Sequence, residues 1–557
     1  MNFTKQIQWL VLLTLLINAA AMLSPVINGG DSVTYAALSQ YIALNNEWAY
    51  LVLDGKDWLD KPHMPFWITA LSFEIGGISA FTYILPGFLF HLIGGYYTYR
   101  IARLFYGRET AWLSLLVYVS VFHLMDSSIE AKAETYLTGF IMGACYYWLR
   151  YDTHAKLKYL LLGALFSACA VMTKGVFTLI TITSGLVCMW IYQKQWRKLW
   201  SGKWLLAFVL SLLFTAPEVI ALYVQFDAHP EKLVFGQNNV SGIKFFLWDS
   251  QFGRFFNTGP IKNQDGHPWY FMAVFLWAFL PWVAVFVAAM LSGGRKLLGG
   301  STDSQAGFIF LCGAFFITFI LFSATKFQLD HYTVILFPFA AILCGKFFSD
   351  WLAQIQISRL LFIAQSVMTF ILVGLAVGLS VYVANPVLLT VVLTMTGGLL
   401  AYGYATRNNQ RTNVVLVYPL FGINILYTFL VLMTALTFTS VSVAHNVNVQ
   451  LTDKPDAPIY VYQMDIVARE LGLYNRSPCY AADTLSQLPV KGESYYLLVR
   501  ETQLAELSSQ IGPSKTVGGG NWVVHKTGTF PRLLRLAKGT EPLEAILIVQ
   551  VEPTRNY

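Results

Sequence analysis

Long apolar runs separated by short charged segments dominate this chain. Runs of this length predict membrane-crossing helices, because roughly 20 apolar residues span the hydrocarbon core of a bilayer. About thirteen such runs stand out, and their expected ranges are 7–25, 80–101, 109–125, 133–149, 158–173, 175–192, 203–223, 269–291, 306–323, 332–349, 359–382, 386–405 and 413–438. The pattern therefore predicts a polytopic α-helical membrane protein.

Composition and charge placement agree with this prediction. The chain is 56% hydrophobic and only 12% charged, whereas soluble domains are roughly a quarter charged. The net charge of +7 is explained by Lys and Arg in cytoplasmic loops, so no nucleic-acid partner is expected. With the N-terminus inside, the outer face receives residues 26–64, 126–134, 173–175, 225–267 and 325–331.

The first apolar run has two interpretations. It could be a cleaved signal peptide, with Ala19-Ala20-Ala21 as the cleavage site. We favour an uncleaved first span, because the run is long enough to cross the bilayer and the charged segment after it belongs with the candidate site.

The chain changes character after about residue 444. Strand-like runs at 459–462, 495–499 and 546–549 are separated by polar turns bearing Pro and Gly. We therefore expect two domains, a membrane module at 1–444 and a small α/β domain at 445–557. An odd number of spans puts the second domain on the outer face.

A charged, proline-broken, aromatic segment follows the first span, from Gly55 to Trp67. Lysine is costly at membrane depth unless it is paired. Asp60 and Lys61 could therefore form a phosphate clamp, with Lys61 as a compact point charge. The alternative is a snorkelling lysine beside an interfacial carboxylate.

Asp31 leads a predicted outer helix that also carries Tyr35. Aspartate is common at helix N-caps, and that is its structural interpretation. The functional one is a general base that takes a proton from an acceptor hydroxyl. The two roles are compatible.

Two carboxylates open the fourth predicted span. Glu130 and Glu134 are four residues apart, which on one helix would place them on the same face. Lys132 would then point elsewhere. Paired carboxylates also admit a divalent cation, although no His–Cys set accompanies them.

Further outer-face residues complete the candidate set. Lys174 ends an outer helix junction, and Arg254 lies between aromatic residues. Arg254 could fork onto a phosphate or stack on a ring, and Lys174 could simply snorkel. Lys326, His331 and Tyr332 precede the tenth span. The chain has no P-loop or dinucleotide fingerprint, so any activated donor is expected to arrive within the membrane.

In this order, the motifs resemble those of the polytopic GT-C glycosyltransferases, specifically the bacterial family-39-like group with the lipid A aminoarabinose transferases and relatives of protein O-mannosyltransferases. The resemblance covers roughly residues 5–350. It is carried by Asp31 with Tyr35, Asp60-Lys61-Pro62 with Phe66-Trp67, Lys132-Ala133-Glu134, Thr173-Lys174-Gly175, Gly253-Arg254-Phe255, Phe279-Leu280-Pro281-Trp282, and Lys326 to Tyr332.

The resemblance implies an inverting transferase of the bacterial inner membrane that uses a polyprenyl-phosphate sugar at its periplasmic face. The acceptor would be an envelope lipid similar to lipid A or a protein hydroxyl. Asp31 and Glu134 would be catalytic, while Lys61, Lys174 and Arg254 would bind the donor phosphate. The resemblance makes Tyr35, Asp60, Lys132, Lys326, His331 and Tyr332 residues of the substrate cavity. It requires no cofactor, and a divalent cation remains open.

Two other classes compete with an enzyme. A transporter or lipid flippase would also have charged cavities near helix breaks, but usually with internal repeats and ionisable residues near mid-span. Here the charges cluster at outer helix ends, which favours chemistry on one face. A non-catalytic scaffold is disfavoured by the recurring outer Lys and Arg residues.

Overall fold

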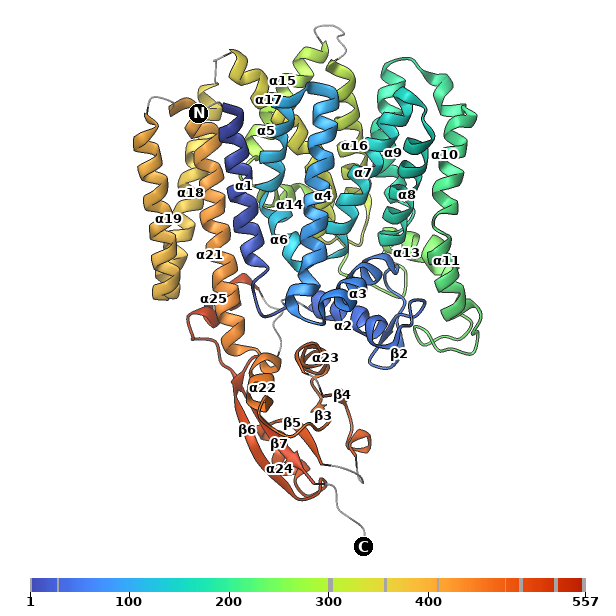
Figure 1. Cartoon of the computed structure of the whole chain (residues 1–557), viewed down its shortest axis with the longest axis vertical. Coiled ribbons are helices and arrows are strands. Elements are labelled where there is room, and N and C mark those ends of the chain that lie inside the picture. The colour runs from blue at the N-terminus through green and yellow to red at the C-terminus, as the bar shows by residue number, and fades with distance from the viewer. Residues whose placement is uncertain are drawn as a thin grey trace.

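The structure of the chain is a computed structural model. It describes residues 3–27, 30–298, 304–354, 358–407, 410–475, 477–489, 494–524 and 529–552. Figure 1 shows an upright helical bundle with a smaller sheet domain below it, at the end opposite the N-terminus.

The bundle is built from apolar helices joined by short loops. Its members are α1 (Phe3–Ala21), α4 (Ala80–Tyr106), α5 (Arg108–Val119), α6 (Phe122–Glu130), α7 (Ala133–His154), α8 (Leu157–Lys174), α9 (Thr178–Tyr192), α10 (Gly202–Leu213), α11 (Ala216–Leu222), α14 (Tyr270–Ala278), α15 (Val283–Leu298), α16 (Ser304–Ala324), α17 (Phe337–Gln354), α18 (Arg359–Val383), α19 (Pro386–Ala405) and α21 (Tyr418–Val441). The polytopic fold is thus confirmed.

The expected number of thirteen spans is not confirmed. Every expected range falls on a helix, but among the described residues eight helices are long and apolar enough to cross a membrane, or ten if two bent pairs each form one span. The pairs α5–α6 and α14–α15 bend by 62° and 110°. Hydropathy alone reports such a bent pair as one continuous run.

Burial separates a packed centre from a lipid-like edge. Most of the segment 330–353 is buried, including α17, whereas little of α18 and α19 is buried. Large apolar side chains such as Leu360, Phe370 and Leu400 are exposed on this edge. Apolar surface of this extent is typical of contact with lipid rather than water.

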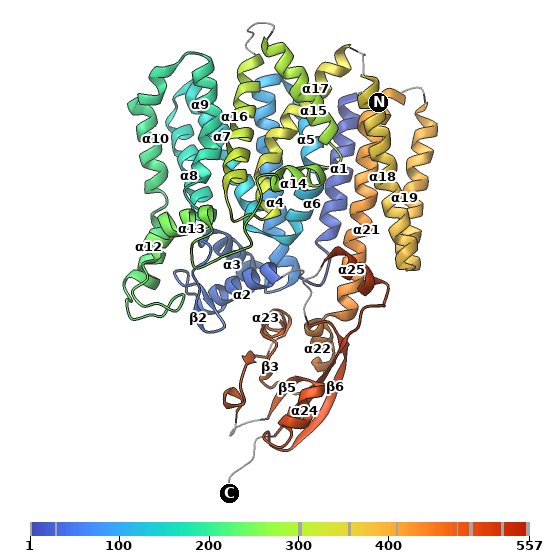
Figure 2. The ribbon, with the colours of Figure 1, turned by 180° about the vertical axis from the view of Figure 1, so that it is seen from behind.

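Short elements gather at the lower end of the bundle. They are α2 (Gly30–Asn45), β1 (Val52–Leu53), β2 (Lys56–Asp57), α3 (Met64–Gly76), α12 (Gly242–Lys244) and α13 (Ser250–Phe256), with one-turn segments η2 (Tyr223–Asp227), η3 (Phe245–Asp249) and η4 (Asp330–Leu336). Figure 2 shows the same gathering from behind. Asp54 and Gly55 join β1 to β2 with positive φ angles of 52° and 73°, as a tight Asp-Gly hairpin requires.

The C-terminal domain is a mixed five-stranded sheet with the order β4-β3-β5-β7-β6. Strand β3 is parallel to β4 and β5, while β7 is antiparallel to β5 and β6. Helices α22 and α23 cover one face and α24 the other. The bounds are α22 (Val443–Leu451), β3 (Ile459–Tyr462), α23 (Asp465–Tyr474), β4 (Cys479–Ala482), β5 (Tyr495–Arg500), α24 (Glu501–Leu507), β6 (Ser514–Trp522), α25 (Phe530–Ala537) and β7 (Glu544–Val551). The small C-terminal α/β domain is therefore confirmed.

Candidate functional site

Asp60 lies at the centre of a cluster of cations at the lower end of the bundle. Its carboxylate pairs with Lys61 Nζ at 2.6 Å and with the guanidinium of Arg254, which also donates to the Asp60 carbonyl at 2.9 Å. All three side chains are largely buried. Arg254 is 194 residues away in sequence, so the fold brings together two of the predicted motifs.

The charges of Asp60 and Lys61 respond to this environment. Burial opposes the Asp60 charge, but Lys61 and Arg254 outweigh it, so the pKa of this carboxyl is below its usual value. Burial and the nearby Arg254 guanidinium lower the pKa of Lys61, against the opposing effect of Asp60. An anionic ligand would relieve this crowding of cations by supplying negative charge.

A second ion pair lies beside the first. Lys174, at the end of α8, pairs with Glu134 at the start of α7, and its Nζ is 3.9 Å from the ring centroid of Tyr332. His331 Nε2 is 3.6 Å from the same Glu134 carboxylate. Lys61, Arg254 and Lys174 thus lie together, with Asp60 and Glu134 as their paired carboxylates and the Asp31 carboxylate close enough to act on both lysines.

An aromatic cavity of about 350 Å³ is lined by two of these cations. Lys174 and Arg254 are its charged lining residues, and Tyr332 also lines it. The rest of its wall is mainly apolar, with Val176, Phe177, Ile180, Phe252, Phe255, Phe256, Leu321, Phe322 and Phe327. A cavity with apolar walls and two cations in its lining suits a ligand that joins a hydrocarbon chain to an anion.

Asp31 and Tyr35 approach this cluster from α2. Tyr35 is buried, and its ring packs edge-on against Phe66, 5.1 Å away between centroids. Burial, with the nearby Asp60 and Asp31 carboxylates, raises the pKa of Tyr35 well above its usual value. The Asp31 side chain is exposed and makes no hydrogen bond or ion pair to other described residues. Its carboxylate is therefore accessible to a substrate.

The prediction that Glu130 and Glu134 share one face of a helix is wrong. Ala131 adopts a left-handed conformation, with φ of 50°, and separates α6 from α7. Glu130 ends the first helix and pairs with Lys132 at 2.5 Å, while Glu134 begins the second and pairs with Lys174. The geometric argument for a divalent cation between these two carboxylates therefore fails, and no described group of three His, Cys, Asp or Glu residues fits a metal ion.

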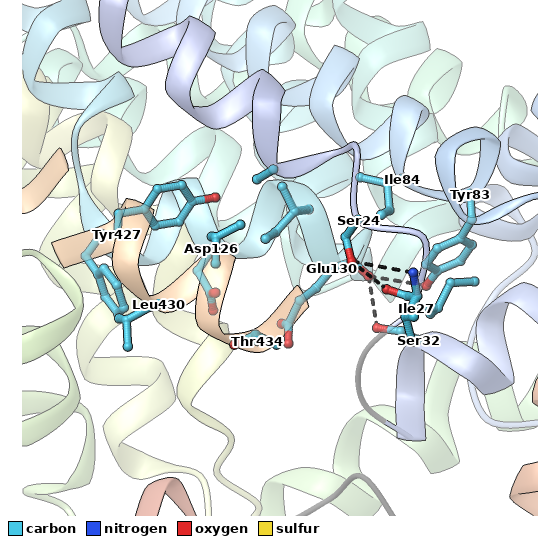
Figure 3. Close-up of a pocket in the computed structure, with 15 residues that line it drawn as sticks. Ser24, Ile27, Ser32, Tyr83, Ile84, Asp126, Glu130, Tyr427, Leu430 and Thr434 are labelled. Carbon is cyan, nitrogen blue, oxygen red and sulfur yellow. Dashed lines mark hydrogen bonds between the residues drawn. The ribbon is translucent and has the colours of Figure 1, made fainter. Parts of the chain in front are cut away.

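Two residues assigned to the cavity lie outside the Asp60 cluster. The Lys326 side chain is exposed, and its Nζ is 3.7 Å from Asp265. Lys132 lies with Glu130, which lines a different cavity of about 200 Å³ next to the start of α2. Figure 3 shows Asp126 and Glu130 with their carboxylates on the same side of that cavity, near Thr434.

A buried polar pair that supports the Asp60 loop was missed by sequence reasoning. Glu218 accepts from the backbone N–H of His63 at 3.0 Å and contacts its Nδ1 at 3.0 Å, and both side chains are fully buried. Gln225, on η2, bonds both backbone groups of Leu51 and the Asp57 carboxylate. The available signal was a lone carboxylate, Glu218, inside the apolar run at 203–223.

Glu218→Ala is expected to destabilise the protein by about 1–3 kcal/mol, because it leaves buried polar groups of His63 without an acceptor. Glu231→Ala is the control, since Glu231 makes the same kind of contact to His229, at 3.0 Å, on the surface. Thermal unfolding of the purified proteins in detergent should show a lower Tm for the first variant alone. Equal Tm values for both variants would contradict a structural role for the buried pair.

The fold matches that of a solved membrane transferase over nearly the whole chain. The crystal structure of ArnT from Cupriavidus metallidurans bound to undecaprenyl phosphate matches with a TM-score of 0.72, covering 98% of each chain at 16% identity. That identity establishes a likeness of fold alone. The ArnT structure in the apo state matches with a TM-score of 0.70.

Sequence comparison points to the same group. Residues 60–220 match the family model for dolichyl-phosphate-mannose-protein mannosyltransferase. An undecaprenyl phosphate-alpha-4-amino-4-deoxy-L-arabinose arabinosyl transferase 2 of Proteus mirabilis is 24% identical over 336 residues, or 59% of this chain and 57% of the relative. The corresponding transferase of Edwardsiella ictaluri is 26% identical over 57% of this chain and 54% of the relative.

These comparisons confirm the predicted resemblance to the GT-C superfamily, with relatives of both the ArnT and the protein mannosyltransferase type. The chain spans somewhat more than half the length of the curated relatives it matches. Together with the apolar helices, the bacterial relatives indicate a multi-pass protein of the inner membrane.

Proposed function

We propose that this protein is an integral membrane glycosyltransferase that moves a sugar from a polyprenyl-phosphate donor to an envelope acceptor, with inversion at the anomeric carbon. The observation that carries the proposal is the aromatic cavity whose lining includes Lys174 and Arg254. Its apolar walls suit a polyprenyl chain, and its two cations suit the phosphate. The names of the curated relatives, undecaprenyl phosphate-aminoarabinose arabinosyl transferases, support the same donor class.

In the proposed reaction an acceptor oxygen attacks the anomeric carbon of the donor sugar. The bond from that carbon to the phosphate oxygen breaks, and polyprenyl phosphate leaves with the electron pair. Lys61, Arg254 and Lys174 stabilise the charge that develops on the phosphate, because fixed cations in a buried site need little reorganisation. The leaving phosphate would compete with Asp60 for Lys61 and Arg254, both of which Asp60 holds in the structure.

Asp31 receives the acceptor proton in this proposal. Its exposed carboxylate lies on the same helix as Tyr35 and close enough to affect it electrostatically. Glu134 acts through Lys174, which it pairs with and orients. The acceptor is either an envelope lipid similar to lipid A or a protein hydroxyl, and only a hydroxyl acceptor needs its proton removed.

The test is transfer by the purified full-length protein from a synthetic polyprenyl-phosphate sugar to lipid A or to a hydroxyl-bearing peptide. We expect a glycosylated product and released polyprenyl phosphate in equal amounts. Transfer from a soluble nucleotide sugar, with none from the lipid donor, would reject the donor class. Lipid movement across vesicles without any transfer would instead favour a flippase.

The loops that carry the candidate site are proposed to face the periplasm. A single cysteine at exposed Lys262, in a background lacking Cys479, is expected to react with an impermeant thiol reagent in cells with a permeabilised outer membrane. A cysteine at Arg197, in a basic loop at the opposite end of the bundle, should react only after the inner membrane is opened. The reverse labelling pattern would contradict this orientation.

A further inference from the structure

Helix α23 of the C-terminal domain makes polar contacts with the first outer loop, while Val523 and Leu536 of the same domain pack against Val26 at the start of the loop. Arg469 forms a two-pronged pair with the Asp54 carboxylate, with Nε at 3.0 Å from Oδ1 and 2.8 Å from Oδ2 and with Nη2 also donating to Oδ2. Gln40 Nε2 donates to the Gly472 carbonyl at 2.7 Å, and the backbone N–H of Ile27 donates to the Tyr474 hydroxyl at 2.8 Å. The last turn of this helix thus makes polar contacts to three separate places in one loop.

These three places bracket the candidate catalytic groups. Ile27 precedes α2, Gln40 lies on α2, and Asp54 lies in the hairpin turn before Asp60. Asp31 and Tyr35 lie between the first two contacts, and Asp60 follows the third. Leu473 of α23 is also part of the apolar core formed by α2 and α3. Helix α23 therefore contacts both α2 and the hairpin that lies between α2 and Asp60.

The opposite side of the hairpin is held by the bundle. Gln225 bonds Leu51 and Asp57, and Lys232 Nζ donates to Asp57 at 3.0 Å. The turn at Asp54 lies between these contacts and Arg469. Two independent elements, one from the membrane module and one from the C-terminal domain, thus meet at the loop that leads to Asp60.

We propose that the C-terminal domain positions the first outer loop for catalysis, with Arg469 as a positioning residue that acts through Asp54. This inference rests on the proposed transfer activity. A partly exposed ion pair adds little to global stability, but its two-pronged geometry fixes orientation. Small misplacement of reacting groups costs far more in rate than in stability.

The test compares Arg469→Ala with Arg500→Ala in the full-length protein. Arg500 pairs with Glu544 at 2.8 Å within the C-terminal sheet, so it is a matched arginine with no contact to the first outer loop. Arg469→Ala should lower kcat by about tenfold or more at nearly unchanged Tm, while Arg500→Ala should behave like wild type. Asp54→Asn should reproduce the loss, because asparagine suits the positive φ at this position but lacks the charge. Arg469→Lys should restore part of the rate.

Hydrogen exchange supplies a readout that does not depend on transfer. Amides of residues 30–60 should exchange faster in Arg469→Ala than in Arg500→Ala. Unchanged exchange and unchanged kcat in Arg469→Ala would overturn the proposal, as would equal effects of the two alanine variants. If the wild-type protein transfers no sugar, the proposed function fails, and the exchange experiment still decides whether α23 holds the loop.

Discussion

Arg254→Ala is expected to reduce kcat/KM for a polyprenyl-phosphate sugar by about 10²–10³-fold, or about 2.7–4 kcal/mol, as for other lost donors to a developing charge. Arg254 lines the aromatic cavity and binds Asp60, so its loss removes a phosphate ligand and releases the Asp60 carboxylate. Negative charge freed next to the donor phosphate would add to the penalty. Lys61→Ala should show a loss of similar size.

The measurement is initial transfer rate against donor concentration, with donor affinity determined separately. Lys244→Ala is the control, because Lys244 is an exposed cation at the same end of the bundle, 3.8 Å from Asp249. We expect Lys244→Ala to retain wild-type kinetics. Folded Arg254→Ala and Lys61→Ala proteins with full activity would refute the phosphate-binding role of this cluster.

The helices were largely predictable from sequence because a bilayer leaves the backbone few choices. Inside lipid every backbone N–H and C=O needs an internal partner, so an apolar run of spanning length forms a helix. Bends were not predictable in this way. The break after Val119 occurs within a run whose hydropathy is continuous, whereas the break after Ala278 contains Pro281, which interrupts a helix and is a local signal. The Phe122 N–H donates to the Leu280 carbonyl at 3.0 Å, so the two breaks also contact each other.

The sequence singled out the residue types of the candidate site but not how their charged side chains pair. Lysine and arginine at outer helix ends are unusual enough to indicate function, and Asp60, Lys61 and Arg254 do lie together. The pairing of Glu134 with Lys174 depends on the left-handed conformation of Ala131, which alanine does not favour. No local pattern indicates that break, so the shared helix face was the natural but incorrect expectation.

The distant residues that hold the loop leading to Asp60 could not be identified from the sequence either. Glu218 and Gln225 lie on the segment after α10, more than 150 residues from the groups they bind. Arg469 lies more than 400 residues from Asp54. Charge and hydropathy along a chain report which side chains need a partner, while the choice of partner is made by the tertiary fold.

Asp31→Asn should distinguish the two acceptor classes. Asparagine keeps the size of the side chain and a hydrogen-bonding oxygen but cannot take a proton at neutral pH. If the acceptor is a hydroxyl, loss of a general base should lower kcat by about 10²–10⁴-fold. If the acceptor is an ionised phosphate, no proton needs to be removed, and the loss should be much smaller.

The experiment uses one variant with two acceptors, a hydroxyl-bearing peptide and lipid A, at saturating donor. Glu74→Gln is the control, because Glu74 is an exposed carboxylate on α3 whose neutralisation should leave both rates unchanged. A loss with the acceptor that wild type uses, at unchanged donor affinity and Tm, would assign Asp31 to acceptor chemistry rather than to stabilising the first turn of α2. A drop in Tm that accounts for the lost activity would instead make Asp31 a structural residue. If Asp31→Asn turned over a hydroxyl acceptor at the wild-type rate, Asp31 could not be the general base.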